Sequence, residues 1–174
     1  MRRALAPLLA VILLVLMAAP TLAGGKPDKQ QNEPLPPEFW PAGVVCDFDL
    51  RIDWVVDTGH SITFPPAADG TVRQIVAGHL VAMITNEEIN QSVTYNISGP
   101  GKFLFDGDIL TIQGSGPWLL YAFPGDAGGP GMWFTKGPVG LTIDLNTGVW
   151  LSASKPRNIV DVCAVLGGAS APDL

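Results

Sequence analysis

The stretch from Asp69 to Phe123, DGTVRQIVAGHLVAMITNEEINQSVTYNISGPGKFLFDGDILTIQGSGPWLLYAF, decides the fold. Its apolar runs are rich in β-branched and aromatic residues, and turn residues such as Gly99-Pro100-Gly101 and Asp106-Gly107 separate them. This alternation is typical of short β-strands. The connections are too short for parallel crossovers, which need about a dozen residues or more, so neighbouring strands must pair antiparallel. The stretch therefore predicts an antiparallel meander with strands over 71–84, 92–98, 102–105, 108–113 and 118–123.

Strand patterns continue on both sides of this stretch. The run from Cys46 to Trp54 alternates apolar and polar residues, which predicts a half-buried strand, and His60 to Phe64 fits a short return strand. The long run 71–84 is apolar at both odd and even positions, so we expect either a bulge near Gly78 or burial on both faces. Further strands are expected over 132–136, 139–145 and 149–153, and Asn158 is placed to cap a short helix over Ile159 to Leu166.

The whole pattern predicts an all-β protein with an antiparallel meander of eight to ten strands and one short C-terminal helix. We expect the meander to close into a β-barrel, because closure removes the free edges of so many neighbouring strands. A β-sandwich is the alternative. It requires Greek-key crossings, and the short connections disfavour these.

The N-terminus has the layout of a secretory signal peptide over residues 1–23, with Arg2 and Arg3, an apolar run and small residues up to Ala23. Residues 24–38 are rich in proline, charge and amides, which predicts a disordered linker. A single β domain is expected over 39–168, followed by a frayed tail over 169–174. These features predict a secreted protein.

Charge and cysteine content agree with export. Without Arg2 and Arg3 the chain keeps eight basic and sixteen acidic residues, a formal charge of −8, which disfavours nucleic acid and membrane surfaces as partners. Cys46 and Cys163 are the two cysteines of the chain. In an oxidising compartment they are expected to form a disulfide that ties the first strand of the domain to its end.

No catalytic motif has the spacing that nucleophilic chemistry requires. The chain has two histidines and lacks the G-x-S-x-G pattern, so the sequence favours a binding module over an enzyme. An enzyme that uses carboxylates alone is the third alternative, and its candidates are Asp47, Asp49, Asp106, Asp108 and Asp144. No metal site or cofactor is predicted, and the row Asp47, Asp49 and Asp53 is interpreted as a solvated strand face.

The sequence places large aromatic residues beside its most flexible internal segment, the glycine-rich loop over 124–131. Trp118, Tyr121, Trp133 and Phe134 flank this loop, and His79 is available for a polar contact. These five residues form our predicted ligand site, and they suggest a small apolar or aromatic ligand in the mouth of the barrel. The alternatives are a surface that binds carbohydrate or protein, and aromatic residues that only fill the core.

Three segments carry a resemblance. They are Val45-Cys46-Asp47-Phe48, the central stretch from Asn96 to Gly101 followed by Asp106-Gly107, and the closing stretch from Asp161 to Leu166. Together with the export signal, these segments resemble small exported proteins of actinomycete bacteria that have no assigned function. The resemblance covers most of the chain after Ala42 and implies no activity and no catalytic residues.

Overall fold

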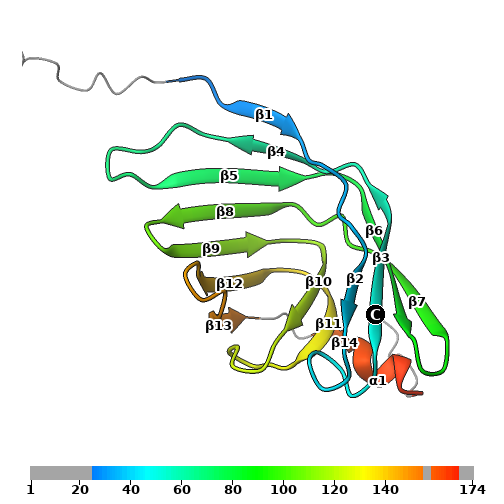
Figure 1. Ribbon diagram of the computed structural model, residues 1–174. Coiled ribbons are helices and arrows are strands. Elements are labelled where there is room, and N and C mark those ends of the chain that lie inside the picture. The colour runs from blue at the N-terminus through cyan, green and yellow to red at the C-terminus, as the bar shows by residue number, and fades with distance from the viewer. Residues whose placement is uncertain (1–24, 155–157, 169–174) are drawn as a thin grey trace, which may run out of the picture.

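The computed structural model describes residues 25–154 and 158–168. The described residues form fourteen strands and one helix (Figure 1). In chain order they are β1 (Asp28–Gln31), β2 (Glu38–Trp40), β3 (Leu50–Asp57), β4 (His60–Thr63), β5 (Val72–Ala77), β6 (Leu80–Asn86), β7 (Gln91–Asn96), β8 (Gly101–Asp106), β9 (Ile109–Gly114), β10 (Pro117–Ala122), β11 (Gly131–Lys136), β12 (Val139–Asp144), β13 (Trp150–Ser154), β14 (Ile159–Asp161) and α1 (Val162–Leu166).

The strands form three sheets in which every pair is antiparallel. A seven-stranded sheet has the order β1-β4-β5-β8-β9-β12-β13, a four-stranded sheet has β2-β3-β6-β7, and a three-stranded sheet has β10-β11-β14. The prediction of an all-β antiparallel fold with one short C-terminal helix is therefore confirmed.

The expected barrel is wrong, because none of the three sheets closes on itself within the described residues, and the arrangement is sandwich-like. Consecutive strands such as β5 and β6 are the two halves of one long strand that bends and passes from one sheet to another (Figure 1). A sandwich therefore arises here without the Greek-key crossings that the prediction assumed. The described residues form more strands than the expected eight to ten for two reasons: the bend at Gly78 divides the expected strand 71–84 into β5 and β6, and β1, β2 and β14 lie in segments where no strand was expected.

Backbone hydrogen bonds between neighbouring bends hold the bends in place and continue the antiparallel pairing from one sheet into the next. Thr58 N donates to His79 O over 2.9 Å, Gly99 N to Pro117 O over 2.9 Å, and Gly137 N to Gly116 O over 2.9 Å. Gly78, where the sequence predicted a bulge, is the bend between β5 and β6 and has a φ of +148°. That conformation favours glycine.

The three-stranded sheet lies between the other two and is covered on both faces. Leu119 and Phe134 pack with residues of the four-stranded sheet, whereas Leu120 and Ala122 pack with residues of the seven-stranded sheet. Figure 1 shows β10 and β11 between β12 and β3. This position explains why β10 is apolar at both odd and even positions, because a strand that is buried on both faces does not alternate between apolar and polar residues.

The disulfide between Cys46 and Cys163 is present, as predicted, and joins the segment before β3 to α1; β3 itself begins at Leu50 and not at Cys46. The helix itself is shorter than predicted. Asp161 rather than Asn158 is its N-cap, accepting the Ala164 N–H over 2.9 Å. Residues Ile159–Asp161 instead form β14, because they pair with β11, and this tertiary pairing overrides the helical pattern.

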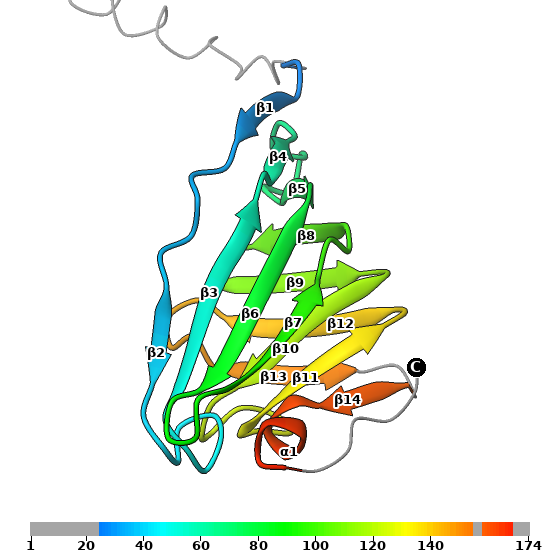
Figure 2. The same ribbon diagram turned by 90° about the vertical axis from the view of Figure 1, so that its right-hand side faces the viewer.

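The segment predicted to be a disordered linker contains β1, which pairs with β4, and most of it runs along the domain (Figure 2). All four β1 residues are exposed. The composition argument missed this strand, because backbone hydrogen bonding at a sheet edge requires no apolar side chains.

Candidate functional site

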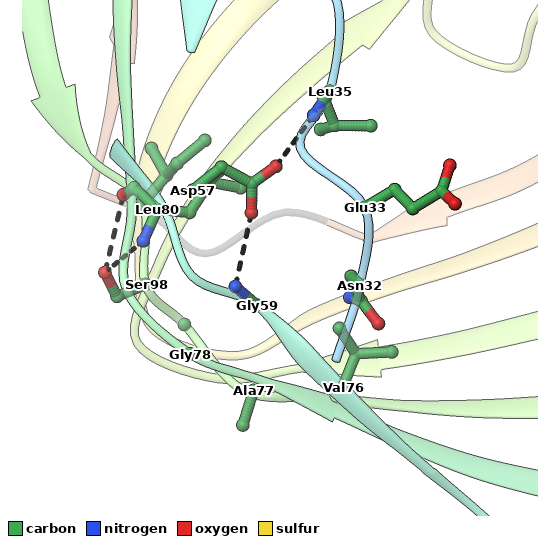
Figure 3. Close-up of a pocket in the computed structure, with 12 residues that line it drawn as sticks. Asn32, Glu33, Leu35, Asp57, Gly59, Val76, Ala77, Gly78, Leu80 and Ser98 are labelled. Carbon is green, nitrogen blue, oxygen red and sulfur yellow. Dashed lines mark hydrogen bonds between the residues drawn. The ribbon is translucent and has the colours of Figure 1, made fainter. Parts of the chain in front are cut away.

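A cavity of about 180 Å³ lies where the seven-stranded and four-stranded sheets meet at their bends (Figure 3). We call it the junction cavity. One wall is the extended segment 32–35, which we call the strap. The other walls come from the β3–β4 bend, the β5–β6 bend and the β7–β8 bend. Its lining residues are Asn32, Glu33, Leu35, Asp57, Gly59, Val76, Ala77, Gly78, Leu80, Ile97, Ser98 and Gly99.

Asp57 fastens the strap to the β3–β4 bend. Its Oδ2 accepts the Leu35 N–H over 3.0 Å, and its Oδ1 accepts the Gly59 N–H over 3.2 Å (Figure 3). The Gly59 carbonyl accepts the Asn32 N–H over 2.9 Å and the Gln31 Nε2–H over 2.7 Å. The strap is therefore tied to the bend at two places, through the Leu35 N–H to the Asp57 carboxylate and through the Asn32 N–H to the Gly59 carbonyl.

The floor of the cavity depends on a close approach of two backbones. A Cβ on Gly78 would lie 2.6 Å from the Gly59 Cα and 2.7 Å from the Thr58 carbonyl oxygen. On the opposite side Ser98 Oγ accepts the Leu80 N–H over 3.0 Å, which joins the β7–β8 bend to the start of β6. The cavity is thus formed by the bends themselves.

The lining gives the cavity a definite chemical preference. Its apolar walls include Leu35, Leu80 and Ile97, and Ile97 is 8% exposed. The charged lining residues are the two carboxylates Glu33 and Asp57. The arrangement therefore suits an apolar group that carries a neutral or positively charged polar group, and it disfavours an anion.

The five residues of the predicted ligand site do not converge. In the pairing of β10 with β11, Leu119 lies opposite Phe134 and Leu120 opposite Trp133. Trp118 and Trp133 pack against the core next to the seven-stranded sheet, whereas Tyr121 and Phe134 belong to the core next to the four-stranded sheet. His79 is exposed, and its carbonyl accepts the Thr58 N–H.

Each of these aromatic residues has a structural environment of its own. Trp118 lies against Gly99, Gly101 and Gly114, and its Nε1–H donates to the Ser115 carbonyl over 3.2 Å. Phe134 stacks on Tyr95 with ring centroids 4.3 Å apart. Tyr121 donates its hydroxyl to Glu38 Oε1 over 3.3 Å, and burial together with this carboxylate raises the pKa of Tyr121.

The glycine-rich loop is attached to β13 through contacts with Trp150. Asp126 is 9% exposed, and its two oxygens accept the Phe123 and Trp150 N–H groups, each over 2.7 Å. Ala127 N donates to the Trp150 carbonyl over 2.9 Å. These contacts hold the loop in place as a connection between β10 and β11.

Two of the five candidate carboxylates, Asp49 and Asp144, hold turns. Asp49 Oδ1 accepts the Ala42 N–H over 2.9 Å, and Asp144 Oδ1 accepts the Asn146 N–H over 2.8 Å. Asp53 forms an ion pair with Arg51 over 2.7 Å. Within the described ranges no group of three histidine, cysteine or acidic side chains is arranged to hold a metal ion.

Sequence reasoning missed the strap and the bends as parts of one site. The signals were the turn Asp57-Thr58-Gly59 and the isolated Gly78 inside an apolar run. The chain matches no protein-family model, no curated protein and no solved structure.

Proposed function

We propose that this protein is an exported binding protein that holds one small, largely apolar molecule in the junction cavity. The observation that carries the proposal is a cavity with apolar walls, closed on one side by a strap that Asp57 fastens in place. Ligand sites are typically concave and mostly apolar, with a few polar groups that orient the guest.

The size of the cavity limits the ligand. Drug-sized ligands occupy about 300–1,000 Å³, whereas this cavity has about 180 Å³. An apolar cavity of about 150 Å³ holds benzene. The proposed ligand is therefore a single ring or a branched alkyl group, or the end of a longer molecule.

The carboxylates at the cavity select the head group. Glu33 and Asp57 would repel a carboxylate ligand, and they would accept hydrogen bonds from an alcohol or an amine. The proposal therefore favours small aromatic or aliphatic alcohols and amines over fatty acids.

Export is supported by two features. The first is the signal-like segment over residues 1–23. The second is the disulfide, since such bonds persist in oxidising compartments. Within the part of the chain that the structure describes, no helix has the length and apolar character to span a membrane.

The proposal is tested with three ligands that share a ring and differ in charge: benzyl alcohol, benzylamine and benzoate. The melting temperature of the purified protein should rise with the alcohol and the amine and stay unchanged with benzoate. Val76→Phe fills the cavity and should abolish the rise. Val72→Phe adds the same bulk on the same face of β5 away from the cavity and should preserve it. An equal response to all three ligands, or to none, would contradict the proposal.

A further inference from the structure

A second concave surface lies at the opposite end of the four-stranded sheet from the junction cavity. This groove of about 390 Å³ is lined by Phe39, Trp40, Pro41, Asp49, Leu50 and Glu87, and we call it the β2 groove. We propose that it docks a basic, extended peptide segment of a partner protein, with a lysine or arginine side chain in the groove. The inference is independent of the proposed ligand in the junction cavity.

The register of the sheet builds the groove. Trp40 pairs with Leu50, and Leu50 pairs with Asn86, so three neighbouring strands are aligned at this end. The residues that adjoin these three positions are Pro41, Asp49 and Glu87, and they line the rim of the groove. Glu87 N donates to the Asp49 carbonyl over 2.9 Å, which joins two of the walls.

The segment behind the groove is held firmly. Asp49 Oδ1 accepts the Ala42 N–H over 2.9 Å, and Gly43 N donates to the Cys46 carbonyl over 2.7 Å. Cys46 is itself fixed by the disulfide to Cys163. A partner would therefore meet a preformed surface, which lowers the entropy cost of binding.

Phe39 is the most conspicuous feature of the groove. Its side chain is 64% exposed, more than any other large apolar residue that the structure describes. The Arg51 guanidinium lies 5.4 Å from the ring centroid, and Asp53 holds that guanidinium over 2.7 Å. The ring therefore already has one cation of the chain beside it, and the Asp53 carboxylate balances the charge of that cation.

Charge complementarity decides which partner fits. The charged lining residues are the carboxylates of Asp49 and Glu87, and both side chains are exposed. An ammonium or guanidinium group in the groove would gain attraction from these carboxylates and from the aromatic faces of Phe39 and Trp40. An acidic segment would meet repulsion at the same place.

The position of β2 favours a peptide. It is the outermost strand of its sheet and pairs only with β3 among the described strands (Figure 2). An extended peptide can add to such an edge through main-chain hydrogen bonds, while its alternate side chains enter adjoining pockets. A basic side chain next to that edge would enter the β2 groove.

The test uses a five-residue peptide with lysine at alternate positions, acetylated and amidated, and its glutamate counterpart. Each is titrated into the purified protein while backbone amide NMR shifts are followed. We expect the lysine peptide to shift the resonances of Glu38–Trp40 and Glu87, with an affinity that falls as sodium chloride is added. The glutamate peptide should cause no shift.

Three variants locate the contacts. Glu87→Gln should weaken the lysine peptide about two- to five-fold, as expected for one exposed ion pair. Phe39→Leu keeps an apolar side chain and should weaken it about two- to five-fold through loss of the cation–π contact. Glu88→Gln removes the same charge one residue away, outside the groove lining, and should leave the affinity unchanged.

Several results would overturn the proposal. Absence of a shift with the lysine peptide would do so, as would equal effects of Glu87→Gln and Glu88→Gln. A parallel titration with cellohexaose tests the competing occupant, a sugar stacked on Phe39. Shifts at Phe39 with the sugar and none with the lysine peptide would replace the basic partner with a carbohydrate.

Discussion

Gly78 and Gly59 meet backbone to backbone at the junction of two sheets, where a Cβ on Gly78 would lie 2.6 Å from the Gly59 Cα. Gly78 also has a φ of +148°, a conformation that side chains rarely adopt. Both features allow β5 to bend into β6 next to the β3–β4 bend. The shape of the junction cavity therefore depends on the absence of a side chain at this position.

Gly78→Ala should lower the free energy of unfolding by about 2 kcal/mol or more, from backbone strain and the clash with Gly59 together. Gly70→Ala is the matched control, because Gly70 has a φ of +88° and nothing within 4 Å of an added Cβ. It should cost about 1 kcal/mol from strain alone. Urea unfolding of both variants measures the difference, and equal losses would show that the close approach contributes nothing.

The Cys46–Cys163 disulfide should be a large contributor to stability. It closes a loop with a sequence separation of 117 residues. Replacing both cysteines with serine should lower the free energy of unfolding by about 4 kcal/mol, chiefly because the unfolded chain gains freedom. Denaturant unfolding of the oxidised and double-serine proteins tests this, and mass spectrometry that detects two free thiols in the protein purified without reductant would refute the premise.

Asp126 should stabilise the glycine-rich loop more than its position in a loop suggests. Its carboxylate accepts two backbone N–H groups over 2.7 Å each, one of them from Trp150. Asp126→Ala leaves both donors without this partner and should cost about 2–3 kcal/mol. Asp144→Ala removes one bond in an exposed turn and should cost about 1 kcal/mol or less. Thermal and urea unfolding should therefore rank Asp126→Ala as the more damaging, and the reverse order would contradict this role.

The two tyrosines should resist ionisation in the folded protein. Burial raises the pKa of Tyr95, and burial with the nearby Glu38 carboxylate raises the pKa of Tyr121. Absorbance at 295 nm should therefore show less than half of the tyrosine as tyrosinate at about pH 10, where an ordinary tyrosine is half ionised. Half-ionisation of both residues at that pH in the folded state would contradict the structure.

The same shifts make stability depend on alkaline pH. The unfolded state releases its phenol protons at lower pH than the folded state does. The stability that the raised tyrosine pKa values contribute is therefore complete below about pH 10 and is lost as the pH rises further. The urea midpoint should fall above about pH 10. The fall should be smaller in Tyr121→Phe, because that variant removes the group with the larger shift.

Local patterns in the sequence predicted much of the fold. The alternation after Cys46 correctly placed Phe48, Leu50 and Ile52 in the core. The turn residues and cysteines likewise predicted the antiparallel pairing of the strands and the disulfide. The bends were not predicted as bends, because whether Gly78 forms a bulge or a corner depends on Gly59, which lies far away in the sequence.

The candidate site was less accessible to sequence reasoning, since four distant segments line the junction cavity. The strap carries little apolar surface, and its order comes from backbone contacts with Asp57 and Gly59. The alternation of side chains along a strand, however, already shows that some of the predicted aromatic residues cannot share one face. Trp118 and Tyr121 are three residues apart in one strand, and Trp133 and Phe134 are adjacent, so each pair must point to opposite faces.

The most direct test of the proposed function locates the guest in the molecule. Methyl ¹H–¹³C NMR spectra recorded during a titration with benzyl alcohol report separately on the junction cavity and on the aromatic core. We predict shifts of the Val76, Leu80 and Ile97 methyl groups, and no shifts in the Val76→Phe variant. Unperturbed cavity methyl groups, or shifts confined to Leu119 and Leu120 between the aromatic residues of β10, would contradict a ligand site at the junction of the sheets.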